Sequence, residues 1–367
     1  MDPVLKPTTQ PLASTLPDPG PGWQRRFWTI FGGQGLSLIG SALTQFVLLW
    51  WITDTTGSIS ALTTAGLAAL LPQALLGPLG GTLADRYSRR ALMIGADAIS
   101  ALCMMVLITL FLTGNIELWH LYTMMFVRSA MQAFQAPAAA ASTALLVPNS
   151  FLPRAAGLNQ SLQGIMTVAA APLGALAIGV MPIGLALGID VITALLGIVP
   201  LLFFKIPQVR AARGSRTGMW QEFVEGVQLV WRQPGLRRLY GLLGVVVLVI
   251  MPSFTLLPLL VRQHFGGGAG EVALMEGLTG LGMLAGGAIV TALAPKRQVR
   301  WVLVGFTAAC LTLALTALMP ADLFWLAVLW WVGSGLAFVL GTRPSLRCCK
   351  RRSPTTCRVE SCPCSAP

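Results

Sequence analysis

The chain has 367 residues, of which 55% are hydrophobic and only 10% are charged, and its formal net charge at pH 7 is +12. Soluble domains usually carry about 25% charged residues, so this composition excludes an ordinary water-soluble protein. The mean hydropathy of +0.73 is typical of a chain whose apolar surface faces lipid. A large positive charge also suggests nucleic-acid binding, and the placement of the basic residues decides between the two.

Residues 1–26 are rich in proline and lack an early apolar region, so we interpret them as a disordered cytoplasmic tail and not as a cleaved signal peptide. A helix needs roughly 20 apolar residues to cross the bilayer core. Ten runs of about this length follow, at residues 27–51, 59–83, 91–113, 118–141, 158–180, 183–204, 238–261, 272–294, 300–319 and 322–341. They predict an all-α membrane protein with about ten transmembrane helices.

A long basic segment, residues 205–237, separates the sixth run from the seventh. Within it, residues 219–231 place aromatic and aliphatic side chains on one helical face, which predicts an amphipathic helix at the membrane interface. The segment therefore divides the chain into a six-helix bundle, residues 27–204, and a four-helix bundle, residues 238–341.

The basic residues follow alternate loops. Of the 25 Lys and Arg residues, all but Arg128 and Arg262 lie in the two tails, in the even-numbered loops, or at the first residue of the helix that follows such a loop. Cytoplasmic loops are enriched in Lys and Arg, so we predict a multi-pass protein of the inner (plasma) membrane with both termini in the cytoplasm. A nucleic-acid binder would not distribute its charge by alternate loops, which argues against nucleic acid as a partner.

The loop between the second and third predicted helices carries the sharpest motif, GPLGGTLADRYSRR at residues 77–90. It resembles the loop signature of the major facilitator superfamily, G-x-L-A-D-R-x-G-R-R/K. The matching residues are Gly81, Leu83, Asp85, Arg86, Arg89 and Arg90. Ser88 replaces the second glycine, so the turn must form without a residue that takes positive φ freely. We expect the glycines in this motif to let helices 2 and 3 approach closely, and Asp85 can pair with a nearby arginine. The alternative to a family motif is a plain basic loop on the cytoplasmic side.

Further segments resemble the same family, and more narrowly its drug- and siderophore-exporting branch, such as macrolide efflux and enterobactin export proteins. In chain order they are Gly33–Ser41, Thr56–Ser58, Leu146–Pro148, Arg154–Gln160 and Glu222–Gly226. The resemblance implies twelve helices in two six-helix halves around a central cavity, which helices 1, 4, 7 and 10 line. In this chain it implies a complete first half and a second half of only four helices.

Polar side chains form stripes on the first and fourth predicted helices, where they recur at helical spacing. They are Gln34, Ser37, Ser41 and Gln45 on helix 1, and Arg128, Gln132 and Gln135 on helix 4. Lipid disfavours such stripes, so we expect them to face protein or a water-filled cavity. For the glutamines, interhelical hydrogen bonding without transport is the alternative.

Arg128 lies near the middle of the fourth helix, where a charge is costly unless it is solvated or paired. It resembles the membrane arginine of the family's R-x-x-Q-G motif, although Gln132 comes one place late and Ala133 stands where glycine would be. We expect a role in coupling or substrate binding, and a structural buried pair is the alternative.

Three acids lie within predicted spans: Asp97, Asp190 and Glu276. Each could carry a proton, and each could instead serve the structure, which we favour for any one of them alone. Asp97 lies near the cytoplasmic end of the third helix and could belong to the network of the preceding loop.

Two motifs that are typical of nucleotide-hydrolysing enzymes and of zinc enzymes are absent from the sequence. It contains no G-x-x-x-x-G-K-[ST] phosphate loop, and neither His120 nor His264 belongs to an H-E-x-x-H zinc motif. We therefore predict no enzyme activity, no cofactor and no metal site.

Residues 342–367 form a basic tail with five cysteines that lack the Cys-x-x-Cys spacing of zinc sites. We hypothesise that one base was lost near codon 342, so that this segment is out of frame. Read two bases on, the codons of Cys348 and Cys349 must give leucine at their junction. One permitted translation of the whole tail resembles a cytoplasmic loop that leads into an eleventh helix. On this hypothesis the chain is C-terminally truncated and its tail binds no zinc.

Together these features predict a monomeric secondary transporter that exports amphipathic small molecules, such as macrolides or siderophores, in exchange for protons and in contact with membrane lipid. Two alternatives stay open. One is a non-transporting, truncated remnant of such an exporter, and the other is an uptake porter for a polar solute.

Overall fold

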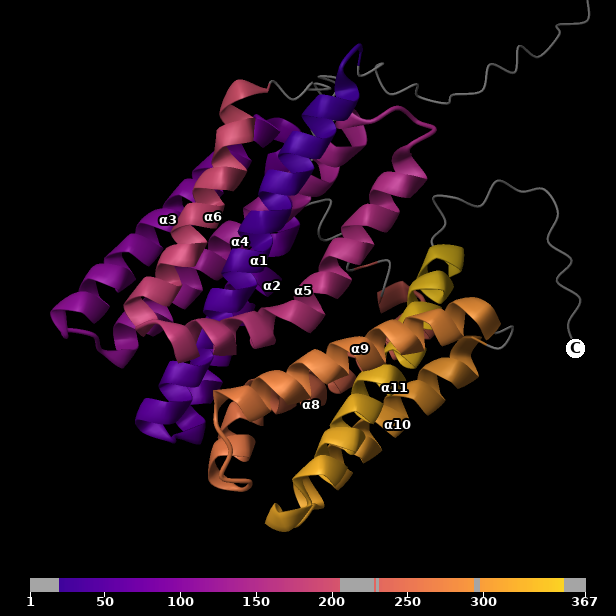
Figure 1. Ribbon diagram of the computed structural model, residues 1–367. Coiled ribbons are helices and arrows are strands. Elements are labelled where there is room, and N and C mark those ends of the chain that lie inside the picture. The colour runs from indigo at the N-terminus through magenta and orange to yellow at the C-terminus, as the bar shows by residue number, and fades with distance from the viewer. Residues whose placement is uncertain (1–19, 205–227, 229–230, 294–297, 353–367) are drawn as a thin grey trace, which may run out of the picture.

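The computed structural model describes residues 20–204, 228, 231–293 and 298–352. Nearly all of this part of the chain is helical (Figure 1). The long helices are α1 (Trp23–Thr56), α2 (Ile59–Arg86), α3 (Arg89–Thr113), α4 (Leu118–Leu146), α5 (Leu152–Val180), α6 (Ile183–Phe203), α8 (Pro234–Gln263), α9 (Ala269–Leu293), α10 (Gln298–Leu318) and α11 (Phe324–Arg352), with a short 3₁₀ turn, η1 (Ala321–Leu323). The predicted all-α fold is therefore confirmed for the described residues. Most of the predicted N-terminal tail, most of the predicted interfacial helix and the tail from residue 353 onward lie outside them.

Several helices extend beyond the apolar runs that predicted them. α1 begins at Trp23, α4 runs to Leu146, and α5 begins at Leu152. The last helix continues to Arg352 and does not end at Gly341, where the apolar run stops. An apolar run marks the part of a helix inside the bilayer core, whereas the backbone hydrogen bonds can carry the same helix on into the polar interface.

Nine of the described helices are long and apolar enough to cross a membrane. The other long helix, α4, carries Arg128, Gln132 and Gln135, whose polar side chains lower its mean hydropathy. Large apolar side chains are exposed on the outside of the molecule; Val180 is 73% exposed and Leu248 is 75% exposed. Lipid tails can cover such a surface directly, because apolar side chains have no hydrogen bonds to lose there. The chain is therefore a multi-pass membrane protein.

The helices form two groups, α1 to α6 and α8 to α11 (Figure 1). In the first group α1 packs against α6, α2 against α4, and α3 against both α4 and α6. In the second group α11 packs against both α9 and α10. α5 lies against α9, and α1 and α2 contact α8, so these pairs join the two groups.

The two groups share apolar packing and polar contacts near the end of α1. Trp50 of α1 is buried in a cluster that consists mainly of residues from α8 to α11. Arg262 of α8 forms an ion pair of 2.9 Å with Asp54 of α1, and both side chains are about half exposed. Gln263 donates a hydrogen bond from Nε2 to the carbonyl oxygen of Gly57 at 2.7 Å. These contacts lie next to the first odd-numbered loop, on the side that the sequence predicts to be outside.

Candidate functional site

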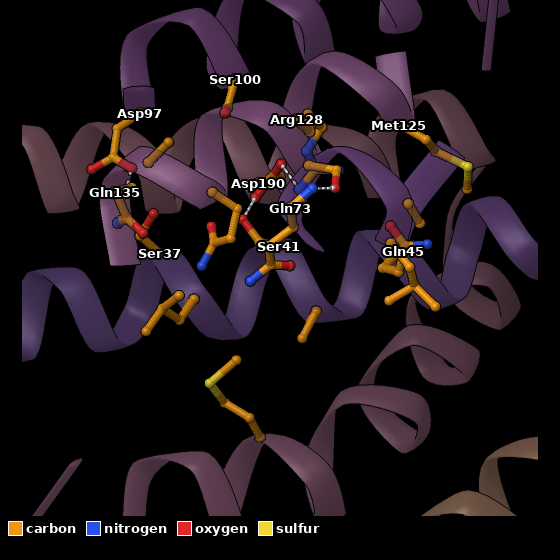
Figure 2. Close-up of a pocket in the computed structure, with 18 residues that line it drawn as sticks. Ser37, Ser41, Gln45, Gln73, Asp97, Ser100, Met125, Arg128, Gln135 and Asp190 are labelled. Carbon is orange, nitrogen blue, oxygen red and sulfur yellow. Dashed lines mark hydrogen bonds and ion pairs between the residues drawn. The ribbon is translucent and has the colours of Figure 1, made fainter. Parts of the chain in front are cut away.

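A polar cavity of about 280 Å³ lies within the first group, and all six of its helices contribute to the lining (Figure 2). It collects most of the site residues that the sequence predicted. These are Ser37, Ser41 and Gln45 from α1, Arg128, Gln132 and Gln135 from α4, and Asp190 from α6. The two polar stripes therefore converge on one space, which is the usual form of a small-molecule site.

Of the predicted substrate or coupling residues, two lie outside this cavity. Gln34 lines an adjoining cavity of about 260 Å³, which shares Gln132 and Gln135 with the first and extends to Phe27 at the start of α1. Glu276 lies in α9, in the second helix group, and lines neither cavity. The structure thus brings Gln34 to the edge of the site and leaves Glu276 apart from it.

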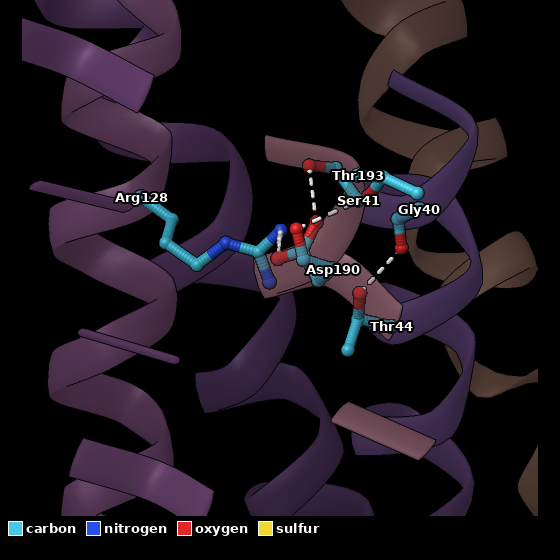
Figure 3. Close-up of polar contacts among 6 residues, drawn as sticks. All are labelled: Gly40, Ser41, Thr44, Arg128, Asp190 and Thr193. Atoms are coloured by element: carbon cyan, nitrogen blue, oxygen red, sulfur yellow. Dashed lines mark hydrogen bonds and ion pairs between the residues drawn. The ribbon is translucent and has the colours of Figure 1, made fainter. Parts of the chain in front are cut away.

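Arg128 and Asp190 form a buried ion pair across the cavity (Figure 3). Nη2 of Arg128 lies 3.1 Å from Oδ2 of Asp190, and the two side chains are 12% and 3% exposed. Ser41 donates a hydrogen bond from Oγ to Oδ1 of Asp190 at 2.8 Å. Nη1 of Arg128 is also buried but has no hydrogen-bond partner among the described residues. The pair neutralises two buried charges and leaves one strong donor unused beside the cavity.

Close packing of α1 on α6 positions this pair. A Cβ atom on Gly40 would lie 2.0 Å from Oγ1 of Thr193, and one on Gly33 would lie 2.6 Å from the carbonyl oxygen of Leu196. Small residues such as glycine let neighbouring helices approach closely. The approach at Gly40 places the next residue, Ser41, against Asp190 (Figure 3).

A second polar cluster, which we name the amide clamp, consists of Gln34, Asp97 and Gln135. The carboxylate of Asp97 accepts hydrogen bonds from Nε2 of Gln34 at 3.0 Å and from Nε2 of Gln135 at 3.2 Å. Gln135 also donates from Nε2 to Oε1 of Gln34 at 2.8 Å, and Gln34 donates from Nε2 to the carbonyl oxygen of Gly197 at 3.2 Å. The clamp therefore links α1, α3, α4 and α6.

The sequence named Asp97 as an acid that could carry a proton, but it related Asp97 to the preceding loop and not to the cavity. Asp97 is 7% exposed and lies at the end of the cavity with Gln135 (Figure 2). Ser100 lines the same cavity. Asp97 and Ser100 are three residues apart, so they form a short polar stripe on α3, the same signal that identified α1 and α4.

The predicted loop motif between α2 and α3 ties the ends of other helices together. Arg89 donates a hydrogen bond from Nη1 to the carbonyl oxygen of Ala141 in α4 at 3.2 Å. Arg90 donates from Nε and Nη2 to the carbonyl oxygens of Leu201 and Leu202 at the end of α6. Cations are stabilised near the carbonyl end of a helix, so this loop holds the ends of α4 and α6 in place.

The turn itself forms as the sequence requires. Ser88 has φ of −62° and caps α3 by accepting a hydrogen bond on its side chain from the backbone of Ala91. No positive φ is needed at this position. Arg86 is exposed. The side chain of Asp85 lies outside the described part of the structure, so its pairing with an arginine stays a prediction.

The close contact of this motif is made by Gly80 and not by Gly81. A Cβ atom on Gly80 would lie 1.9 Å from the carbonyl oxygen of Ala133 in α4, whereas one on Gly81 would meet nothing within 4 Å. α2 packs extensively on α4 and only slightly on α3. The expectation that these glycines bring helices 2 and 3 together is therefore wrong, because the neighbour of α2 at this point is α4. Successive residues of a helix point about 100° apart, so of these two glycines only Gly80 faces that neighbour.

Comparison with known proteins identifies the family. Residues 30–348 match the model of the Major Facilitator Superfamily. The chain belongs to this superfamily. It is also 32% identical over 329 residues to macrolide efflux protein A of Streptococcus pyogenes, a match that covers 88% of this chain and 81% of that protein.

Solved structures of this superfamily's fold agree. The nucleoside transporter NupG matches with a TM-score of 0.64 over 90% of this chain and 83% of its own, at 17% identity. A bacterial homologue of the lysosomal transporter Spinster matches with a TM-score of 0.63 over 89% of this chain and 75% of its own, at 14% identity. The predicted family and fold are confirmed, and the chain is a membrane transporter of the major facilitator type.

Proposed function

We propose that this transporter exports macrolides or similar amphipathic molecules from the cytoplasm in exchange for protons. The relative in Streptococcus pyogenes is a macrolide efflux protein, which supports the substrate class and the direction. The observation that carries the proposal is the buried pair of Arg128 and Asp190 beside a polar cavity. Charges inside an apolar bundle are expensive, and by default they indicate a substrate or ion pathway.

The cavity offers hydrogen bonds that suit a macrolide, a large lactone rich in hydroxyl and carbonyl oxygens. A buried donor without a partner costs about 1–3 kcal/mol, and a substrate oxygen at Nη1 of Arg128 would offset this cost. Gln45, Gln132 and Ser37 add further polar groups. At about 280 Å³ the cavity holds one polar part of such a molecule, and the remainder would extend between the two helix groups.

Transport requires that the site open to each side in turn. We assign residues 27–204 and 238–341 to two bundles that rock against each other, as in other transporters with a midplane site. The contacts of Asp54 with Arg262 and of Gln263 with Gly57 would close the outer side. With both termini in the cytoplasm, as the basic loops favour, a monomer in the plasma membrane would release its substrate outside.

Expression in a bacterium that lacks its own macrolide exporters tests this function. Cells that make the protein should accumulate less radiolabelled erythromycin than cells with an empty vector, and a protonophore should abolish the difference. A parallel measurement with a radiolabelled siderophore tests the second substrate class. Unchanged accumulation, with the protein detected in the membrane, would favour a non-transporting remnant, and increased accumulation would favour an uptake porter.

A further inference from the structure

The amide clamp holds a buried carboxylate that has no cation partner in the part of the chain that the structure describes. Both oxygens of Asp97 accept hydrogen bonds from neutral amides, those of Gln34 on α1 and Gln135 on α4. The charged groups that line the same cavity are Arg128 on α4 and Asp190 on α6, and they pair with each other at 3.1 Å. Ionised Asp97 therefore leaves one negative charge unbalanced among the groups that line this cavity, whereas ionised Asp190 is compensated by Arg128.

The clamp also lies where the two cavities meet. Asp97 lines the first cavity and Gln34 lines the second, while Gln135 lines both. The second cavity extends to Phe27 and Leu146, which lie near the ends of α1 and α4 that the sequence predicts to be cytoplasmic. A proton held at Asp97 therefore lies in the lining of the first cavity, and one side chain, Gln34 or Gln135, separates it from the second.

We propose that Asp97 is the carboxyl group that binds and releases the transported proton, an inference that rests on the proposed proton-driven export. In the step a proton from water adds to one carboxylate oxygen of Asp97 and later leaves as a proton. No other bond forms or breaks. Asp190 pairs with Arg128 at 3.1 Å and serves to position that arginine.

Protonation changes the hydrogen bonds that hold the helices. A protonated Asp97 must donate one hydrogen bond, but both amides that touch it present N–H groups. If the clamp is to accept this proton, one amide must therefore turn over. If Gln135 turns, its bond to Oε1 of Gln34 is lost, and if Gln34 turns, its bond to the carbonyl oxygen of Gly197 is lost. Either turn breaks a link between α1 and another helix, so the proton state of Asp97 changes how firmly α1 is held.

Infrared spectroscopy of the purified full chain in lipid tests this assignment without any substrate. We expect a difference spectrum between acidic and alkaline pH to show the C=O stretch of a buried protonated carboxyl. Asp97→Asn should lose this band, Asp97→Glu should move it, and Glu276→Gln should keep it. Labelling with ¹³C-aspartate should shift it in the wild type, which assigns the band to aspartate even if Asp97→Asn does not fold. Absence of the band in the wild type, or its persistence in folded Asp97→Asn, would overturn the proposal.

Transport measurements separate this proposal from the proposed function. In liposomes, Asp97→Asn should lose accumulation of erythromycin driven by a pH gradient but retain exchange of labelled for unlabelled erythromycin, because exchange needs no net proton movement. If the wild type transports with protons and the band survives in Asp97→Asn, the function stands and the role of Asp97 falls. If the band belongs to Asp97 but the wild type moves no erythromycin, the assigned proton site stands and the function falls.

Discussion

Two buried acids in the first helix group have different surroundings and therefore different consequences. Asp190 is held by Arg128 and Ser41, so its charge is compensated. Among the described residues, Asp97 is held by the amides of the clamp and by no cation. The sequence shows both as isolated acids in apolar runs, because their partners lie on other helices. The stripes on α1 and α4 predicted which residues face the cavity, but they could not predict which of those residues pair.

The first prediction concerns Arg128. Arg128→Ala should abolish transport and leave membrane insertion intact. It should also destabilise the protein by about 3–5 kcal/mol, since it leaves Asp190 buried without its cation. The double variant Arg128→Ala with Asp190→Ala should recover most of this stability but none of the transport. Thermal stability in detergent and erythromycin flux at equal expression measure both effects, and unchanged flux in Arg128→Ala would show that the arginine is merely structural.

At the scale of helices, small residues decide which elements meet. α1 approaches α6 at Gly33 and Gly40, and α2 approaches α4 at Gly80. The family motif drew attention to Gly81, which faces open space. Sequence alone could not separate two adjacent glycines, because the helix that receives the contact is set by the packing of the whole bundle and not by the order of helices along the chain.

Adjacent substitutions test this packing. Gly80→Ala should destabilise the protein by about 1–3 kcal/mol, because its methyl group would overlap the carbonyl oxygen of Ala133. Gly81→Ala is the matched control and should be neutral or stabilising by up to about 1 kcal/mol, since alanine favours the helix. Melting temperatures of the two variants in the same detergent give the comparison, and equal melting temperatures would contradict the assigned α2–α4 contact.

For the whole molecule, hydropathy and charge predicted the number of helices and a topology, whereas the helix ends and the contacts between the two groups required the structure. Arg262 is one example, since the sequence marks it as an exception to the charge pattern. The structure pairs it with Asp54 of the other helix group. A pairing between residues 208 positions apart in the chain has no local sequence signal.

Topology can be tested by labelling introduced cysteines in intact cells, after the native cysteines are replaced. A membrane-impermeant thiol reagent should label Thr113→Cys or Ala321→Cys, which lie at the ends of helices next to odd-numbered loops. It should not label Ser88→Cys, which is exposed on the predicted cytoplasmic side. Labelling at position 88 in intact cells would refute the orientation.

Proton-driven flux in liposomes tests proton-coupled macrolide export most directly. Purified protein is reconstituted, the lumen is made acidic, and radiolabelled erythromycin is added outside; protein-free liposomes correct for trapping of a weak base. Wild-type liposomes should accumulate erythromycin above this background, and a protonophore or Arg128→Ala should remove the excess. Accumulation no greater than in protein-free liposomes, or an excess that survives the protonophore, would contradict proton-coupled export.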